Sequence, residues 1–275
     1  PLNIAETTMT TSTPPAAPVR HRDVPLLNDL PRPVYARVEN LRHRADTQPH
    51  SHPWVQLSYA SRGVLEIRTA EGLFLAPPQW AILVPPRVRH AVRNSARTEM
   101  RSLYIDAAVL PDAGPACQVL AVSDLLREMI RHFSQLPVHY DEDGADGRLV
   151  RVLLDQVQAA VRVSFSLPWP AHAQLRELCT AMLARPQRPV RREHWSAAMG
   201  VSVRTLERMF QRDTGMNMRE WRLRARLLHA LPLLERGDSV TDVALACGYE
   251  STSSFIASFR RFFGATPGTF SAAAD

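Results

Sequence analysis

One short pattern occurs twice in the C-terminal third of the chain and constrains its fold more than any other feature. A glycine is followed by a serine, then by an apolar residue four positions after the serine, and by a phenylalanine four positions further on. The two copies are Gly200, Ser202, Leu206, Phe210 and Gly248, Ser251, Phe255, Phe259. Glycine accepts the positive φ of a tight turn, serine caps the next helix, and side chains four residues apart share one helix face. The pattern therefore predicts two helix-turn-helix units.

A predicted helix at 217–235 connects the two units. At 1.5 Å per residue it spans roughly 28 Å, close to the ~34 Å between successive major-groove faces of a DNA duplex. One chain would therefore reach two adjacent segments of the major groove. The alternative is a plain helical bundle, in which the glycines and apolar stripes serve only the core. The doubled turn, the doubled cap and the basic exposed faces favour the helix-turn-helix interpretation.

The charge distribution indicates a polyanionic partner for the same part of the chain. All 33 basic residues are arginines, and the formal net charge is +6. Up to Ala171 the chain has 18 arginines and 17 acidic residues, whereas the remainder has 15 arginines and only 10 acidic residues. The excess in the last third is typical of nucleic-acid binding, although a modest positive charge is also common in proteins that bind none.

Residues 34–105 have the pattern of short antiparallel strands. Val55, Leu57 and Tyr59 alternate with other positions, and glycines and proline pairs separate the apolar runs. The predicted strands lie at 55–60, 64–68, 73–75, 81–84 and 103–105. Strands of this length, joined by tight turns, predict a small β-barrel or sandwich.

Beyond Pro111 the apolar residues recur with helical period. Two amphipathic stretches are expected as helices, at 119–133 and 148–163. The apolar stripe of the second stretch consists of Val150, Leu153, Leu154, Val157 and Val161. Two prolines within 166–170 cannot continue a helix, so a domain boundary is predicted there.

The predicted fold class is α+β, with a barrel followed by an all-α domain. The predicted parts are a disordered leader at 1–20, a barrel at 21–110, a helical segment and linker at 111–166, and an all-α domain at 171–275. The helices of the last part are predicted at 172–184, 191–199, 202–213, 217–235, 239–246 and 251–263.

The N-terminal part contains a pattern of histidines that suits metal binding. His50 and His52 have the same strand parity, Gln56 follows four residues later, and His90 comes after a proline pair at the end of a later strand. Three neutral imidazoles and one oxygen would suit Zn, Ni, Co, Mn or Fe(II). The alternative is a polar cluster that faces an organic ligand.

Several classes of protein are disfavoured. There is no run of about 18 apolar residues, and the N-terminus lacks the pattern of a secretory signal, so a cytoplasmic location and no membrane partner are expected. Cys117, Cys179 and Cys247 are far apart and odd in number, which predicts buried thiols. No Ser-His-Asp order, P-loop or GxGxxG motif supports hydrolase or nucleotide chemistry.

The last hundred residues resemble the DNA-binding domain of the AraC family of transcription regulators. The resemblance rests on Trp195 and on the segments 202–215 and 239–267. It implies that the helices at 202–213 and 251–263 are recognition helices. The residues implied to face bases are Arg204, Glu207, Arg208, Thr252, Ser253 and Ala257. Arg212, Arg260 and Arg261 are expected to contact phosphates, with an ordinary solvated face as the alternative.

The histidines, in turn, resemble the two cupin signatures, with Pro85, His90 and Asn94 in the second. Two departures weaken the match, because cupins with bound metal usually carry Glu at the position of Gln56 and Gly at the position of Arg87. Some AraC-like regulators carry such a barrel in front, where it senses an effector and dimerises. The candidate pocket aromatics are Trp54, Tyr59, Phe74 and Trp80.

The predicted function is a bacterial transcription regulator whose cupin-like domain senses a small molecule or metal and whose helix-turn-helix units bind promoter DNA. No enzymatic activity is expected. The alternative is a metal-dependent cupin enzyme, a dioxygenase or isomerase, that the helical domain tethers. RNA polymerase is an expected partner if the protein activates. The resemblance of the stretch 148–163 to the dimerising helices of the family implies a homodimer, unless that stripe packs on its own barrel.

Overall fold

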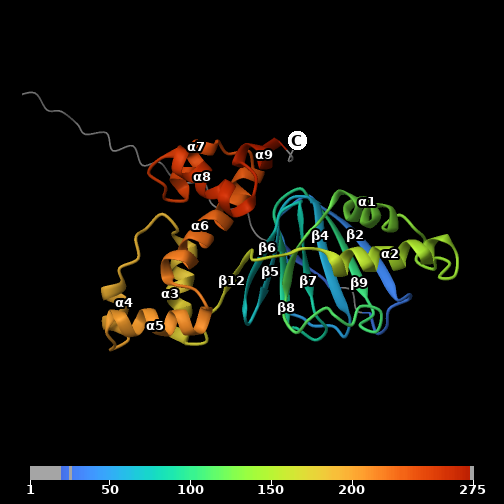
Figure 1. Cartoon of the computed structure of the whole chain (residues 1–275), viewed down its shortest axis with the longest axis horizontal. Coiled ribbons are helices and arrows are strands. Elements are labelled where there is room, and N and C mark those ends of the chain that lie inside the picture. Colours follow the sequence, from blue (N-terminus) through green and yellow to red (C-terminus); the bar gives the residue numbers. More distant parts are fainter. Residues whose placement is uncertain (1–19, 25–26, 273–275) are drawn as a thin grey trace, which may run out of the picture.

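The computed structural model describes residues 20–24 and 27–272. Figure 1 shows two parts, a β-rich part flanked by two helices and a group of shorter C-terminal helices. The α+β prediction is confirmed, since only helices follow residue 168 in the described part of the chain. The predicted leader lies outside the described residues except for Arg20, which begins strand β1.

The strands form two six-stranded sheets that face each other. The first sheet has the order β1-β3-β8-β5-β6-β12, and the second has the order β11-β10-β7-β4-β9-β2. The strand bounds are β1 (Arg20–Arg22), β2 (Val34–Leu41), β3 (Ala45–Thr47), β4 (Val55–Arg62), β5 (Leu65–Thr69), β6 (Gly72–Ala76), β7 (Trp80–Val84), β8 (His90–Asn94), β9 (Thr98–Ile105), β10 (Gln118–Ala121), β11 (Arg162–Val163) and β12 (Ser166–Pro168). Each of the five predicted strands is present.

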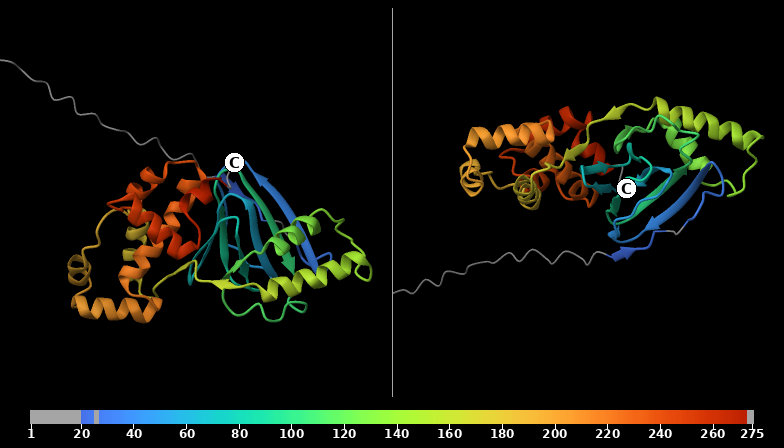
Figure 2. Two further views of the ribbon diagram at one scale, coloured as in Figure 1. Left: turned by 45° about the horizontal axis from the view of Figure 1, so that its top comes forward. Right: turned by 90° about the horizontal axis from the view of Figure 1, so that it is seen from below.

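Two helices, α1 (Asp124–Phe133) and α2 (Ala145–Ala159), cover the outer face of the second sheet (Figure 2). Leu153 and Val157 of α2 are 0% and 1% exposed and belong to one core cluster with Leu103 of β9. The stripe therefore packs largely on its own barrel, as the alternative has it, although Val161 is 68% exposed, and the homodimer stays a prediction. The outer face of the second sheet is apolar, and a layer of helices is required to bury it.

Three strands lie where a helical segment and linker had been predicted. Gln118–Ala121 is strand β10, whose Val119 pairs with Ile82 of β7, and α1 begins only at Asp124, after the cap Ser123. The second helix ends at Ala159, before β11. Ser166–Pro168 is β12, at the edge of the first sheet, where proline is tolerated. Short apolar runs suit both helix and strand, so only pairing with distant segments decided between them.

The C-terminal helices agree with the predicted ones to within one residue at each end. They are α3 (Ala173–Ala184), α4 (Arg192–Ala198), α5 (Val203–Thr214), α6 (Met218–Glu235), α7 (Val240–Ala246) and α8 (Thr252–Phe263), followed by α9 (Pro267–Ala272), which the sequence analysis did not predict. The first helix-turn-helix unit consists of α4 and α5, and the second of α7 and α8. Helix α6 connects the two units (Figure 1).

The helical domain packs directly against the barrel. The indole Nε1 of Trp221 on α6 donates a hydrogen bond of 2.9 Å to the carbonyl of Pro168 on β12. Trp80 of β7 stacks on Phe270 of α9, with ring centroids 5.9 Å apart, and lies 6.2 Å from Phe263 of α8. Trp80, predicted to line an effector pocket, therefore belongs to the interface with the second helix-turn-helix unit, and that prediction is wrong.

Candidate DNA-binding surface and effector site

Both helix-turn-helix units have the local geometry that the repeated pattern predicts. Gly200 and Gly248 have φ angles of 64° and 75°, in the left-handed region that favours glycine. The hydroxyl oxygen of Ser202 accepts a hydrogen bond of 3.2 Å from the amide three residues later, and that of Ser251 accepts one of 3.3 Å. The apolar residues four and eight positions after each serine are fully buried. The turn, cap and packing predictions are confirmed.

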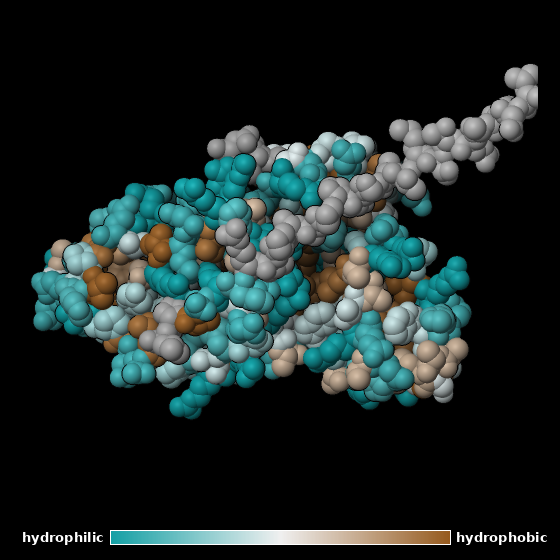
Figure 3. Space-filling view, turned by 180° about the vertical axis from the view of Figure 1, so that it is seen from behind, coloured by the Kyte–Doolittle hydropathy of each residue, from teal (hydrophilic) through white to brown (hydrophobic). Residues whose placement is uncertain are grey.

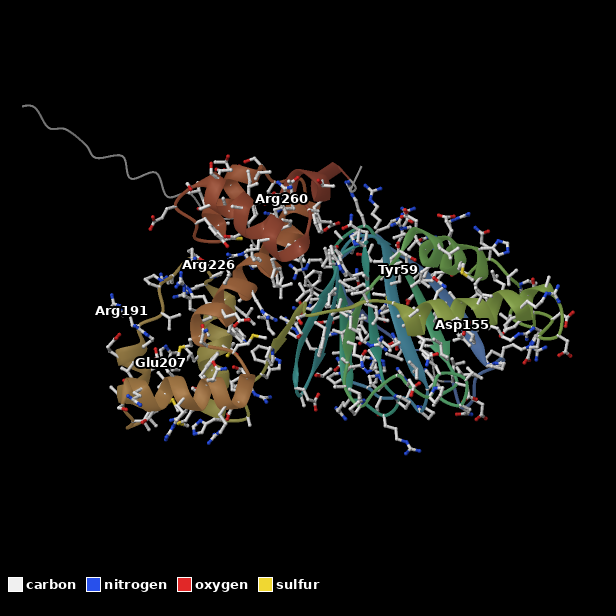
Figure 4. The ribbon with its side chains drawn as sticks, in the orientation of Figure 1. Tyr59, Asp155, Arg191, Glu207, Arg226 and Arg260 are labelled. Atoms are coloured by element: carbon white, nitrogen blue, oxygen red, sulfur yellow. The ribbon has the colours of Figure 1, made fainter. Side chains whose placement is uncertain are left out.

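Helix α5 presents one paired glutamate and two arginines that form no ion pair with any residue that the structure describes. Arg204 and Arg208 are exposed and lie one turn apart, so they share a face of the helix. Glu207, labelled in Figure 4, accepts a hydrogen bond of 2.5 Å from Nη1 of Arg192 on α4. The carboxylate implied to face bases is thus already bound within its own unit.

Helix α8 presents only short, uncharged side chains at the corresponding positions. Ser253 and Ala257 are exposed on one face of the helix. The Thr252 hydroxyl is partly buried and donates a hydrogen bond of 3.4 Å to Thr241 of α7. Two of the three side chains implied to face bases therefore have no hydrogen-bond partner within the described part of the chain.

The three predicted phosphate contacts lie at the ends of the two recognition helices. Arg260, labelled in Figure 4, and Arg261 are exposed in the last turn of α8. Arg212 is 70% exposed, and its Nε and Nη2 donate to one carboxylate oxygen of Asp213, at 3.0 and 2.9 Å. Asp213 also accepts a hydrogen bond from the amide of His172, the residue that precedes α3, so Asp213 joins the end of α5 to the start of α3.

The structure reveals a further basic element that the sequence analysis missed. The loop at 185–191, between α3 and α4, is held by two arginines of α6. Arg222 donates to the carbonyls of Pro186 and Arg188, and Arg226 donates to Pro186. Figure 4 labels Arg191 at the end of this loop and Arg226 on α6. The density of arginine at 185–192 was the available signal.

At the other end of the molecule, the three predicted histidines converge inside the barrel. His50 and His90 form an isolated bridge between the strands, and their ring centroids are 4.4 Å apart. The ring of His52 lies 5.1 Å from that of His90, and one nitrogen of each ring lies within 4.8 Å of the others. His50 and His52 converge although neither lies within one of the strands given above.

The hydrogen bonds of the rings fix their protonation. Nδ1 of His50, His52 and His90 each donates 2.9 Å to the backbone carbonyl of a residue two positions away. In a neutral ring the lone pair is then on Nε2, and Nε2 of His90 is buried without a hydrogen-bond partner among the described residues. Such outer hydrogen bonds are typical of metal-bound histidines. The three rings therefore fit a transition metal.

Gln56 adjoins the cluster through His52. Its Oε1 lies 2.8 Å from Nε2 of His52, and its Nε2 donates to the hydroxyl of Ser58. Two acceptors at that distance require a proton or a cation between them, or the amide turned so that its NH2 group donates. Burial lowers the pKa of His50 and His52 below 6.5 and that of His90 to about 3. The rings are thus neutral at pH 7, as metal ligands must be.

The turn before His90 is retained although it lacks the glycine of the cupin pattern. Arg87 occupies the left-handed region, with a φ of 64°, and its amide donates a hydrogen bond of 2.7 Å to the carbonyl of His52. This bond joins the two histidine-bearing segments. An arginine therefore adopts a backbone conformation in which glycine would be unstrained.

Of the predicted pocket aromatics, only Trp54 adjoins the histidines. Its ring stacks on His52 with centroids 5.2 Å apart. Tyr59, labelled in Figure 4, belongs to the core cluster beneath α1 and α2, on the opposite face of the sheet. Phe74 pairs with Ile67 in the apolar core. Alternation along a strand does not reveal which face is the interior.

Tyr104 is a site residue that the sequence analysis missed. Its ring lies 6.1 Å from His52 and 5.9 Å from Trp54. Ser102 shares its strand parity on β9. The Ser102 hydroxyl and the Trp54 Nε1 are buried, and no residue that the structure describes forms a hydrogen bond with either of them. These polar groups give the histidine cluster a wall that can bind an organic molecule.

Two family models match the chain. A model described as an AraC-like ligand binding domain matches residues 33–199, and one described as a helix-turn-helix domain matches residues 195–273. No helix in the described part of the chain has the length and apolar character of a membrane span.

Individual proteins agree with these matches. The chain is 31% identical over 223 residues to the HTH-type transcriptional regulator NimR of Escherichia coli strain K12, which covers 80% of this chain and 81% of NimR. It is 38% identical over 103 residues to the regulator RipA of Corynebacterium glutamicum, 38% of this chain and 31% of RipA. The similarity to a solved AraC-type DNA-binding domain from Chromobacterium violaceum extends over 37% of this chain and 91% of that chain, with 31% sequence identity and a TM-score of 0.35. The chain therefore belongs to the AraC family, as a DNA-binding transcription regulator with an N-terminal ligand-binding domain.

Proposed function

We propose that the protein regulates promoters by binding double-stranded DNA through α5 and α8, with α5 supplying most of the direct base recognition. The observation that carries this proposal is the pair of equally capped helices at the two ends of α6, whose 18 residues span roughly 27 Å. That length is near the spacing of successive major-groove faces.

The two helices contribute differently. The exposed Arg204 and Arg208 can each bind O6 and N7 of a guanine, whereas Ser253 and Ala257 offer only single hydrogen bonds and methyl contacts. The second unit therefore contributes mainly position and DNA shape. The phosphate contacts come from Arg212, Arg260 and Arg261.

The barrel, in this proposal, senses a small effector rather than catalysing a reaction. His50, His52 and His90 would hold a divalent transition metal, with Gln56 as the oxygen donor, and the metal would supply a Lewis acid toward an effector oxygen. An amide in place of a carboxylate leaves the site more positive than an enzymatic cupin site. The buried donors Trp54 Nε1 and Ser102 Oγ favour a polar effector that carries acceptor groups.

The assembly belongs to the same proposal. Leu125 of α1 and Val152 of α2 are 56% and 46% exposed on the outer side of the barrel, where they offer an apolar surface to a second copy. A homodimer would place four helix-turn-helix units on one promoter. RNA polymerase is the further partner if the regulator activates, and a protein that acts on bacterial promoters works in the cytoplasm.

The experiment that tests the proposal is chromatin immunoprecipitation of the full chain in its own host, followed by fluorescence anisotropy on the recovered fragment. Specific occupancy and an affinity that falls steeply with salt are expected. Absence of binding to any promoter fragment at low salt would contradict the DNA assignment. Oxygen uptake or isomerisation by the metal-loaded protein would favour the enzyme alternative.

A further inference from the structure

The loop at 185–191 lies between the two helix-turn-helix units and adjoins both. Near its start, Cα of Gln187 is so close to Gly248, in the turn of the second unit, that a Cβ on Gly248 would lie only 2.5 Å from it. At its end, Arg191 leads into α4, where Arg192 is paired with Glu207 on the exposed surface of α5. Figure 1 shows the loop on the side of the helical domain that faces away from the barrel. The loop therefore spans the gap between the two units.

The side of the helical domain that faces the barrel is apolar and already covered. Figure 3 shows hydrophobic side chains at the junction between the barrel, on the left, and the helical domain, on the right. Phe262 and Phe263 of α8 pack there against Phe165, with ring centroids 5.1 and 5.0 Å apart. This side is closed to DNA, whereas the loop lies on a side that the barrel leaves open.

The loop carries a high density of positive charge. Four arginines and no acidic residue occur between positions 185 and 192, and Arg185, Arg188 and Arg191 are exposed. Two further arginines, Arg222 and Arg226 of α6, lie directly behind the loop. None of these five arginines forms an ion pair with a residue that the structure describes. Arginines gathered in this way without carboxylate partners suit a polyanion.

The backbone of the loop is held in place although it is neither helix nor strand. Nη2 of Arg222 donates hydrogen bonds of 3.3 and 2.6 Å to the carbonyls of Pro186 and Arg188. Nε of Arg226 donates one of 3.0 Å to Pro186, and the guanidinium carbon of Arg226 lies 5.6 Å from the ring centroid of Tyr249 in the second unit. The two prolines of the loop fix two of its φ angles. The exposed arginines are therefore presented from a preorganised backbone, which lowers the entropy cost of binding.

The place of the loop corresponds to a minor groove of the DNA. Two recognition helices in successive major-groove segments leave a minor groove between them on the same face of the duplex. In homeodomains the loop before the helix-turn-helix contacts the DNA backbone, and the loop at 185–191 has the same place in the first unit, between α3 and α4. A minor groove narrowed by A·T pairs has an enhanced negative potential, which attracts inserted arginine side chains.

We propose that the loop at 185–191 is a third DNA-binding element, which inserts Arg188 and Arg191 into the minor groove between the two major-groove segments. The base pairs there form a spacer that neither α5 nor α8 contacts, and the loop selects a spacer rich in A·T pairs. This inference rests on the proposed function, because it requires both recognition helices to be bound to the same duplex.

The experiment measures the affinity of the full chain, by fluorescence anisotropy, for three versions of the recovered promoter fragment that differ only in the spacer. The spacer consists of A·T pairs, of G·C pairs, or of inosine·cytosine pairs, which keep the major-groove pattern of G·C but lack the N2 amino group in the minor groove. The A·T and inosine spacers are expected to bind at least fivefold more tightly than the G·C spacer.

The double variant Arg188→Ala/Arg191→Ala is expected to reduce this preference to less than twofold. Arg42→Ala/Arg148→Ala is the matched control, because it removes the same charge from exposed positions of the N-terminal domain and should keep the preference. Equal affinity of the unaltered chain for the A·T and G·C spacers, or a preference that the loop variant retains, would overturn the proposal.

An inosine spacer that binds like the G·C spacer would also overturn it, because the bases would then be read outside the minor groove. Specific binding of the fragment without any spacer preference contradicts this inference and leaves the proposed function intact. Absence of specific binding to all three fragments contradicts the proposed function, and this inference with it.

Discussion

Nη1 of Arg192 on α4 lies 2.5 Å from Oε1 of Glu207 on α5, so an ion pair joins the two helices of the first helix-turn-helix unit. The side chains are 50% and 45% exposed. An ion pair this open to solvent contributes little to stability. Its effect is on charge, because it neutralises the only carboxylate between Arg204 and Arg208 on the exposed surface of α5.

Removal of Arg192 alone should therefore weaken DNA binding more than removal of Arg192 and Glu207 together. We expect Arg192→Ala to weaken promoter binding by roughly 1 kcal/mol relative to Arg192→Ala/Glu207→Ala, because an unpaired carboxylate repels phosphates. Fluorescence anisotropy with the four members of the double-mutant cycle measures this difference. Additive effects of the two substitutions would show that the ion pair has no role at the DNA.

Substitutions at Arg204 and at Arg212 should affect DNA binding in different ways. Arg204→Ala is expected to weaken the preferred site by about 1–3 kcal/mol and to relax specificity at one base position, because a bidentate contact to guanine is lost. Arg212→Ala should weaken all sequences equally and reduce the salt dependence by about one ion. Binding to a library of single-base variants of the site measures both. A uniform loss for Arg204→Ala would reassign it to a phosphate.

The histidine cluster should bind metal in a manner that depends on position 56. Gln56→Glu is expected to raise the affinity for Zn²⁺ by about 10- to 100-fold, because it adds a negative charge and the donor usual in metal-bound cupins. His52→Ala should abolish binding. Competition with a chromophoric chelator measures both. Metal content that neither substitution changes would leave these side chains as hydrogen-bonding groups for an organic effector.

The turn before His90 should carry measurable strain at Arg87. Arg87→Gly is expected to give a free energy of unfolding about 1 kcal/mol higher than Arg87→Ala, because only glycine adopts the observed φ without strain. At the neighbouring exposed Arg89, which has no positive φ, alanine should be at least as stable as glycine. Urea unfolding compares the two pairs. If the glycine variant were more stable than the alanine variant at both positions, or less stable at both, the positive φ at Arg87 would be contradicted.

Protonation of His229 should destabilise the protein in mild acid. Burial first, and then the charge of Arg236, lowers the pKa of His229 below 6.5, so the unfolded chain binds a proton that the folded chain does not. The corresponding stability is complete above pH 6.5 and is lost below it, by at most about 1.4 kcal/mol per pH unit. His229→Gln should flatten this decline in urea unfolding between pH 7.5 and 5. His132→Gln, at an exposed position on α1, should leave the slope unchanged, and a slope equally steep in both variants would refute the assignment.

The helical domain could be predicted from sequence because its determinants are local. A cap, a turn glycine and two apolar side chains lie within about ten residues of each other, so the pattern around Ser202 and Ser251 carries nearly all the information that its helices need. The convergence of His50, His52 and His90 was predicted from spacing together with the resemblance to cupins. The hydrogen bonds that set their tautomers come from backbone carbonyls two residues away.

Only the tertiary structure decided which surface each apolar side chain covers. Tyr59, Trp80 and Leu153 all look like residues of a pocket or an interface in the sequence, but they lie beneath α1 and α2, against α9, and on the second sheet. Strand β12 exists because Leu167 pairs with Leu73 from a distant part of the chain. Residue type and period determine how much apolar surface a segment must bury. Which other segment covers that surface depends on packing between elements far apart in sequence.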